Sequence, residues 1–430
     1  MEQQPLSHRH IIGNPLSLGS ICGQITLPTS KSLSNRVLII AALCGGCTLH
    51  KLSDADDTRL LQTALCSSSD KARYVGAGGT TARFLTAYFA ASEGTRLLYG
   101  TPRLHQRPIA DLVNALRDLG ASITYEGIEG CLPLRIVGKA LRGGAVSLNA
   151  NISSQFVSAL LLIAPTFAEG LELTMNQNPV SKPYIDMTLG IMRHFGVAHT
   201  WKGNTISIAP QSYIARSYTV EADWSAASYY YAAAALAQQA DITLYGLQTE
   251  SLQGDRRIAD IARTTWGIST HYQANGIRLL RPSNTPPYTS LADEWCFDFT
   301  PCPDIAQTVA VVNAALGIPS RLTGLQTLRH KETDRIAALD NELQKIGYRL
   351  LPDADSSKAS CRLLPIPHYT PLTAHDAPPR FATYDDHRMA MAVAPLSLRY
   401  PQGIIVENAD VVGKSYPYFW HDWERLYKGE

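Results

Sequence analysis

Basic residues stand at the start of several apolar stretches of the sequence, and they are the residues with the clearest chemical meaning. Lys31 and Arg36 precede VLIIAAL, Arg83 precedes FLTAYFAA, and Arg388 precedes MAMAVAPLSL. A cation at the start of a helix opposes the helix dipole and is unfavourable unless an anion lies nearby. Helix starts also present unpaired N–H groups that bind anions. The sequence therefore predicts sites for two small phosphate-bearing substrates.

Small polar residues that could bind the oxygen atoms of such ligands occur at other helix starts. Ser153, Ser154 and Gln155 precede the apolar run FVSALLLIA. One serine at such a position most often caps its helix, but two serines and a glutamine together favour contact with a ligand. Residues 76–79 (GAGG) precede another apolar helix, and their glycines would let the backbone approach a phosphate closely.

The elements that must position these residues are helices of two kinds. Helices of the first kind are apolar on nearly every side, which predicts burial, and they start near residues 31, 79, 153, 223, 303 and 386. Helices of the second kind are amphipathic and start near residues 57, 108, 183, 255, 334 and 417. The runs GCLPLRIVG, LELTMN, ADITLYGL and GIIVEN predict strands between them.

A buried helix, an outer helix and strands thus recur about six times, three times in each half of the chain. A chain of 430 residues also exceeds the size at which one core stops growing. We therefore expect an α/β (α+β) protein of two domains, each built from three repeated units.

Composition narrows the class of protein. Hydrophobic residues make up 45% and charged residues 17% of the chain, as in a globular protein. With 38 basic and 37 acidic residues, the whole-protein charge favours neither nucleic acid nor membrane as a partner. The start of the sequence has no apolar signal core, and no apolar run reaches the length of a membrane span. These features predict a cytoplasmic protein.

The eight cysteines include one CxxC pair, Cys44 and Cys47. A zinc or redox site is one interpretation of this pair, but no second Cys or His pair accompanies it. The other interpretation, which we favour, is that the small residues of CGGC end a helix. We therefore expect no metal.

Several longer motifs resemble one enzyme family. KSLSNR before an apolar helix, LRHKETDRI and YDDHRMAMA are similar to segments of the 5-enolpyruvylshikimate-3-phosphate synthases. ISSQF, PVSKPYIDMT, PRLHQRP, CPDIA and VVGKSYP also resemble segments of that family, in the family's order. The resemblance extends from about Gly23 to the C-terminus.

The resemblance implies a two-domain inverse α/β barrel in which each domain has three βαβαββ-type units and the domains close over the substrates. Residues 1–28 with 222–430 would form the domain that carries the base and binds phosphoenolpyruvate. Residues 29–221 would form the domain that binds shikimate 3-phosphate. The stretch 57–76 is shorter than is usual in the family, so one unit of the first half is expected to be truncated.

The reaction implied by the resemblance belongs to chorismate and aromatic amino-acid biosynthesis. The 5-hydroxyl of shikimate 3-phosphate adds to C2 of phosphoenolpyruvate, and phosphate then leaves from a tetrahedral intermediate. The resemblance implies no cofactor and no metal. We further expect a monomer whose only partners are these two substrates, without nucleic acid or membrane.

The resemblance also assigns residues. Those implied to bind shikimate 3-phosphate are Lys31, Ser32, Arg36, Ser153, Ser154, Gln155, Ser181, Tyr184, Asp304, Thr327 and Lys331. Those implied to bind phosphoenolpyruvate are Lys31, Gly79, Arg107, Gln155, Arg335, His387, Arg388 and Lys414. The implied catalytic residues are Asp304 as the general base, with Lys31 and Glu332 for proton transfer at the enolpyruvate carbon. Arginine suits such ligands because its planar fork binds carboxylate or phosphate at two points.

Two residues depart from the family pattern. Ala77 and Thr327 stand where the family usually carries asparagine. A lost hydrogen bond costs about 0.5–1.5 kcal/mol, which is too little to abolish activity.

Two other functions stay open. One is enolpyruvyl transfer to UDP-N-acetylglucosamine, but relatives of that type carry a cysteine shortly before an Arg-Pro pair, and residues 101–106 (TPRLHQ) before Arg107 contain none. The other is a non-catalytic ligand-binding relative, which would have no need for Lys31, Asp304, Glu332 and Lys414 together.

Overall fold

The computed structural model describes residues 8–11, 20–66, 72–149, 154–176, 182–283, 294–353 and 360–428. The chain divides into two compact units. Unit 1 comprises Met1–Pro28 and Ala222–Glu430, and unit 2 comprises Thr29–Glu221. The chain therefore begins in unit 1, forms unit 2, and returns to unit 1 at Ala222.

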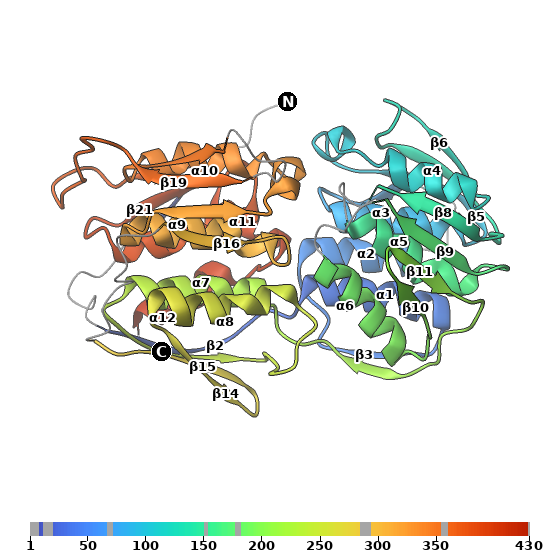
Figure 1. Cartoon of the computed structure of the whole chain (residues 1–430), viewed down its shortest axis with the longest axis horizontal. Coiled ribbons are helices and arrows are strands. Elements are labelled where there is room, and N and C mark those ends of the chain that lie inside the picture. The colour runs from blue at the N-terminus through green and yellow to red at the C-terminus, as the bar shows by residue number, and fades with distance from the viewer. Residues whose placement is uncertain are drawn as a thin grey trace. The chain divides into compact units, whose positions relative to one another are not determined.

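Unit 2 is built on three buried helices that contact one another: α1 (Lys31–Cys44), α3 (Gly79–Ala90) and α5 (Ser154–Ile163). Its outer helices are α2 (Asp56–Cys66), α4 (Ala110–Asp118) and α6 (Lys182–His194). Its strands are β3 (Thr48–His50), β4 (Arg73–Tyr74), β5 (Gly94–Tyr99), β6 (Ser122–Tyr125), β7 (Leu134–Gly138), β8 (Gly144–Leu148), β9 (Leu171–Met175), β10 (Thr200–Lys202), β11 (Thr205–Ile208) and β12 (Ser217–Thr219). Figure 1 shows these elements from blue to green.

Unit 1 is likewise built on three buried helices in mutual contact: α7 (Trp224–Leu236), α9 (Ala306–Leu316) and α11 (His387–Val393). Its other helices are α8 (Ile258–Ile261), α10 (Arg335–Gln344) and α12 (Phe419–Lys428). Its strands are β1 (His8–Ile11), β2 (Ser20–Thr26), β13 (Gln239–Tyr245), β14 (Ser269–Gln273), β15 (Gly276–Arg281), β16 (Trp295–Asp298), β17 (Ser320–Thr323), β18 (Tyr348–Pro352), β19 (Cys361–Pro365), β20 (Arg380–Phe381) and β21 (Ile404–Glu407).

The strands form three sheets in each unit, counted over the described ranges. Unit 2 has the orders β4-β5-β7-β6 and β10-β11-β9-β8 and a two-stranded sheet, β12-β3. Unit 1 has β14-β15-β13-β2, β16-β17-β19-β18 and β1-β21-β20. Each sheet of three or four strands mixes parallel with antiparallel pairs. Three sheets per unit match the predicted number of repeats, but the repeat and its truncation stay predictions, because residues 67–71 lie outside the description.

The helix predictions are confirmed, with one difference. All twelve predicted segments contain helix, and all thirteen residues of α7 are buried, as its all-round apolar sequence requires. The segment that starts at Asp255 is not one continuous α-helix. It consists of a 3-10 turn (Gly254–Arg257), α8 and a π-helical turn (Ala262–Trp266). The hydroxyl of Thr264 donates to the carbonyl of Asp260 at 2.8 Å, so that this carbonyl has a second potential donor beside the backbone.

The glycines after Cys44 end α1, as expected. Gly45 has φ +67°, a conformation that side chains other than glycine adopt at a cost, and its N–H donates to the carbonyl of Ala41 at 3.0 Å. Across the described part of the chain, no helix is both long and apolar enough to cross a membrane.

Candidate active site

The start of α1 in unit 2 holds a buried ion pair. Lys31 Nζ lies 3.0 Å from Asp57 Oδ2, and the two side chains are 14% and 5% exposed. Asp57 belongs to the first turn of α2, and its backbone carbonyl accepts a hydrogen bond from Thr81 of α3. The charged partner of Lys31 in this contact is thus a carboxylate. Asp57 therefore supplies part of the negative charge that offsets the unfavourable position of Lys31 at a helix N-terminus.

Arg36, one turn further along α1, is buried among neutral groups. Its guanidinium donates to Thr188 Oγ1 at 2.8 Å, to the carbonyl of Ser32 at 2.8 Å, to the carbonyl of Tyr184 at 3.2 Å and to Ser158 Oγ at 3.3 Å. Burial lowers the pKa of Arg36 to about 10. The charge is therefore hydrogen-bonded but not neutralised by any of these partners.

Gly79 begins α3, where two arginines converge. A Cβ placed on Gly79 would lie 2.7 Å from one guanidinium nitrogen of Arg107 and 2.8 Å from the other, and still closer to Arg83. A side chain at this position would displace the guanidinium groups of both arginines from where they lie. The guanidinium of Arg83 also lies over the ring of Phe156 in α5, 5.4 Å from its centre, and donates to the carbonyl of Pro108. This geometry gathers positive charge over a helix N-terminus, as an anion site requires.

The remaining expected residues of unit 2 lie on α5, on α6 and at the start of α1. Ser154 is buried in the first turn of α5, and Gln155 is half-buried beside it. The ring of Tyr184 lies 5.9 Å below the guanidinium of Arg36, so Tyr184 packs against that cation. The expected Ser153 and Ser181 lie outside the described residues.

In unit 1, Asp304 is the centre of a charged cluster. It lies in the 3-10 turn that leads into α9, and three cations reach its carboxylate. Lys331 Nζ is 3.3 Å and Arg335 Nη1 is 3.2 Å from Oδ1, while Arg388 Nη2 is 3.1 Å from Oδ2. Burial lowers the pKa of Lys331, although Asp304 acts in the opposite direction. The structure therefore brings together three expected residues and the expected base.

Arg335 joins Asp304 to two further carboxylates. At the start of α10 it donates to Asp386 at 2.6 Å and to Glu332 at 2.9 Å, with only 1% of its side chain exposed. Burial alone would lower the pKa of Arg335, but Asp386, Glu332 and Asp304 outweigh burial and raise it. Lys414 donates to the other oxygen of Glu332. Glu332 thus lies between two cations.

Asp386 also caps α11, because its carboxylate accepts the N–H of Arg388 at 2.9 Å. His387 follows it, and its Nδ1 lies 3.7 Å from Asp386. Thr327 lies in the 3-10 turn Gln326–His330 before Lys331. Its hydroxyl is buried and has no hydrogen-bond partner within the described residues.

Sequence reasoning did not assign two carboxylates that organise these clusters, Asp57 and Asp386. Asp386 lies within the quoted segment YDDHRMAMA, and its place directly before a buried helix is a capping signal that could have found it. Asp57 carries no comparable signal for its contact with Lys31, since the two residues meet only through the packing of α1 on α2.

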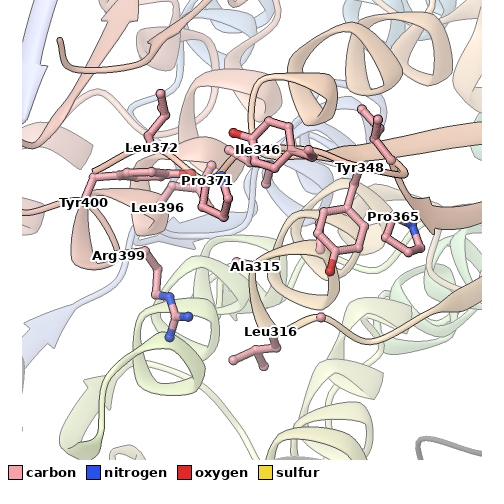
Figure 2. A pocket seen from close by; sticks show the side chains of 15 residues that line it. Ala315, Leu316, Ile346, Tyr348, Pro365, Pro371, Leu372, Leu396, Arg399 and Tyr400 are labelled. Atoms are coloured by element: carbon pink, nitrogen blue, oxygen red, sulfur yellow. The ribbon is translucent and has the colours of Figure 1, made fainter. Parts of the chain in front are cut away.

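Unit 1 also contains a cavity of about 540 Å³ at the C-terminal end of α9, lined by Leu316, Tyr348, Arg399 and Tyr400 among others. Figure 2 shows the prolines and tyrosines that border it. Asp304 precedes the N-terminal end of the same helix. None of the expected site residues lines this cavity, so it is separate from the charged cluster.

Taken unit by unit, the arrangement suits chemistry on phosphates and carboxylates. Arginines and lysines supply bidentate and point-charge partners for anions. Asp304 and Glu332 are carboxylates that pair with these cations. An anionic ligand that enters the cluster would replace them as partners of the cations. Among the described residues, no group of three His, Cys, Asp or Glu side chains could hold a metal ion.

Comparisons with known proteins agree with this chemistry. Residues 61–423 match the family model of EPSP synthase (3-phosphoshikimate 1-carboxyvinyltransferase). A 3-phosphoshikimate 1-carboxyvinyltransferase of Bacteroides fragilis strain YCH46 is 44% identical over 416 residues, which cover 96% of this chain and 97% of the relative. One from Haemophilus influenzae strain KW20 is 34% identical, covering 95% and 97% of the two chains.

Solved structures share the fold. EPSP synthase from Acinetobacter baumannii has a TM-score of 0.75 at 21% identity and covers 98% of both chains. The enolpyruvyl transferase NikO from Streptomyces tendae has a TM-score of 0.69 at 15% identity, covering 98% of this chain and 97% of its own. The two-domain fold predicted from the sequence is thereby confirmed. The motifs, the fold and the matched family model together identify the chain as a member of the 3-phosphoshikimate 1-carboxyvinyltransferase family.

Proposed function

We propose that this chain transfers the enolpyruvyl group of phosphoenolpyruvate to the 5-hydroxyl of shikimate 3-phosphate and releases phosphate. The observation that carries the proposal is the convergence of Lys331, Arg335 and Arg388 on Asp304. The proposed enzyme acts in the cytoplasm as a monomer in aromatic amino-acid biosynthesis.

Shikimate 3-phosphate is proposed to bind mainly to residues of unit 2. Arg36 is the strongest candidate for its anionic groups, because every hydrogen bond that this buried cation donates within the described residues goes to an uncharged partner. A bound phosphate or carboxylate would neutralise a charge that burial otherwise penalises. The other proposed ligands in this unit are Lys31, Ser32, Ser153, Ser154, Gln155, Ser181 and Tyr184. In unit 1 they are Asp304, Thr327 and Lys331.

Phosphoenolpyruvate is proposed to bind to the cations of both units. The proposed ligands are Lys31, Gly79, Arg107, Gln155, Arg335, His387, Arg388 and Lys414. In unit 1 the cations already contact Asp304, Glu332 or Asp386. Binding of the phosphate and carboxylate of this substrate would therefore replace protein carboxylates as partners rather than fill a site without counter-charges.

The proposed chemistry assigns one proton transfer to each of three side chains. Asp304 accepts the proton of the 5-hydroxyl as its oxygen bonds to C2 of phosphoenolpyruvate. Lys31 supplies a proton to C3, which becomes a methyl group, and the tetrahedral intermediate forms. Glu332 then takes a proton from that methyl group as the C2–O bond to phosphate breaks. Glu332 is placed for this role between two cations, Arg335 and Lys414.

The test is phosphate release from phosphoenolpyruvate in the presence of shikimate 3-phosphate, with formation of the vinyl ether product. We expect turnover with this acceptor and none with UDP-N-acetylglucosamine. A reaction without any acceptor controls for simple hydrolysis. Turnover only with UDP-N-acetylglucosamine, or no turnover with either acceptor, would contradict the proposal. Light scattering of the active protein should give a mass near the 47.0 kDa of one chain.

A further inference from the structure

A buried carboxylate adjoins the charged cluster of unit 1, outside the quoted sequence motifs and the residues assigned above. Asp255 is 4% exposed and begins the broken helical segment after β13. Its Oδ2 accepts a hydrogen bond from the hydroxyl of Ser225, in the first turn of α7. Burial of an ionisable side chain costs free energy unless the side chain is paired and hydrogen-bonded. The role of the contact between Asp255 and Ser225 is therefore of interest.

The contact continues to the centre of the cluster. Ser225 Oγ accepts a hydrogen bond from Arg388 Nη2 at 3.4 Å. The same nitrogen donates to Asp304 Oδ2 at 3.1 Å, and Arg388 Nη1 donates to the carbonyl of Asp304 at 3.3 Å. Asp255, Ser225, Arg388 and Asp304 therefore form one continuous chain of polar contacts.

The direction of each hydrogen bond gives Asp255 a specific effect. A serine hydroxyl has one proton and two acceptor lone pairs. Since that proton is donated to Asp255, the oxygen can only accept from Arg388. Without an acceptor at Asp255, the hydroxyl could rotate its proton toward the guanidinium and lose the bond to Arg388. The carboxylate thereby sets the orientation of the serine.

The backbone around this contact is fixed by a second residue of the same loop. Gln253 Oε1 accepts the N–H of Trp224 at 3.1 Å, and its Nε2 donates to the carbonyl of Ala222 at 2.8 Å. Asp223 caps α7 through the N–H of Ser225. Gln253 therefore binds the backbone on both sides of Asp223, and Asp223 binds the backbone of Ser225. Electrostatics agree with the proximity, because burial and then Asp304 raise the pKa of Asp255 to about 7.

We propose that Asp255 and Ser225 are positioning residues that hold the guanidinium of Arg388 in the orientation in which it binds phosphoenolpyruvate. This inference rests on the proposed function, since it assigns Arg388 to that substrate. Neither residue touches a substrate in the proposal. Asp255 acts through Ser225, and Ser225 acts through Arg388.

Steady-state kinetics of single variants test the proposal with both substrates varied. For Asp255→Ala and for Ser225→Ala, we expect the KM for phosphoenolpyruvate to rise about tenfold, the size of effect that outer partners of ligating groups have. The KM for shikimate 3-phosphate should change less than about twofold. Asp255→Asn keeps an acceptor oxygen without the charge, so it should restore part of the loss. Asp260→Asn, an exposed neighbour on α8, is the matched control.

The double variant Asp255→Ala with Ser225→Ala shows whether the two residues act in series. We expect it to be no worse than either single variant, because the second change removes a contact that is already lost. Equal increases of both KM values, multiplicative effects in the double variant, or unchanged kinetics in Ser225→Ala would overturn the proposal. Ser225→Ala removes a single oxygen atom and is therefore the milder change. If Asp255→Ala does not fold, the kinetics of Ser225→Ala alone test the proposal. Failure of the wild-type protein to turn over shikimate 3-phosphate would instead contradict the proposed function.

Discussion

Two buried arginines, Arg36 in unit 2 and Arg335 in unit 1, are held in opposite ways. Arg36 donates to two hydroxyls and two carbonyls, and burial lowers its pKa to about 10. Arg335 contacts three carboxylates, which together raise its pKa in spite of burial. The guanidinium of Arg36 is hydrogen-bonded to neutral groups, whereas that of Arg335 is neutralised by carboxylates.

This difference suggests how each region responds to an anion. A ligand near Arg36 adds a counter-charge to a cation whose hydrogen-bonded partners have none, so electrostatics favour binding directly. A ligand near Arg335 must compete with Asp304, Glu332 and Asp386 for the same guanidinium. The region around Arg36 is therefore prepared for an anion, whereas the cluster around Arg335 must exchange partners.

The largest expected effect comes from removing the carboxylate at the centre of the unit 1 cluster. Asp304→Asn abolishes the proposed general base and leaves Lys331, Arg335 and Arg388 with one fewer counter-charge. We expect kcat to fall about 10²–10⁴-fold, the range typical of general base catalysis. Phosphate release with both substrates at saturation measures the effect, and Asp260→Asn serves as the control. A kcat within threefold of the wild-type value would remove Asp304 from the chemistry.

The next effect separates the two arginines by their contribution to stability. Arg335→Met leaves Asp386, which is 0% exposed, without its arginine, and breaking such a buried pair costs about 3–5 kcal/mol. Arg36→Met removes hydrogen bonds to neutral groups but also an unneutralised buried charge, so we expect a smaller cost of about 1–2 kcal/mol. Denaturant unfolding of the ligand-free variants measures both. Equal costs, or a larger cost for Arg36→Met, would mean that the difference in charge balance has no energetic consequence.

A smaller effect is expected from Asp57, the carboxylate that pairs with Lys31 at the start of α1. Asp57→Asn leaves Lys31 without its carboxylate partner, so the anion site of unit 2 gains net positive charge. We expect inorganic phosphate to bind about three- to tenfold more tightly, since one nearby unit charge changes affinity by roughly this factor at partial burial. The rise of Tm with phosphate concentration reports the affinity. Asp54→Asn, exposed and outside the cluster, is the control, and weaker phosphate binding by Asp57→Asn would contradict the expectation.

Much of this architecture is readable from the sequence because it depends on local patterns. The buried helices follow from apolar residues on all sides, and the positions of Arg36, Gly79 and Arg388 follow from motifs near the starts of these helices. These features require no knowledge of which helices become neighbours. The same holds for the end of α1 at Gly45, whose positive φ is a property of one residue.

The carboxylates that pair with the buried cations could not be predicted from local sequence patterns. A cation at a helix start predicts a nearby anion, but it does not say whether a ligand or the protein supplies it. For Lys31 and Arg335 the protein does so, through Asp57 and Asp386, which come from other helices and lie 26 and 51 residues away in the chain. Asp255 went unassigned for the same reason, since its partner Ser225 lies 30 residues earlier.

The smallest expected effect concerns Asp255, whose charge state links stability to pH. Its pKa rises from 3.8 to about 7 on folding, so between about pH 4 and pH 7 the native state binds more protons than the unfolded state. Stability from this group is therefore complete below about pH 4 and is lost as pH rises through 7. Asp255→Asn cannot titrate, so its Tm relative to wild type should increase from pH 5 to pH 8. The increase should be a few degrees at most, roughly 2 °C per kcal/mol for a chain of this size.

The control for this measurement is Asp260→Asn, whose Tm should differ from the wild-type Tm by a constant amount over the same pH range. A relative Tm of Asp255→Asn that stays constant or falls with pH would show that Asp255 is already ionised at pH 5. In that case it would differ little from the other carboxylates that balance the cations of unit 1.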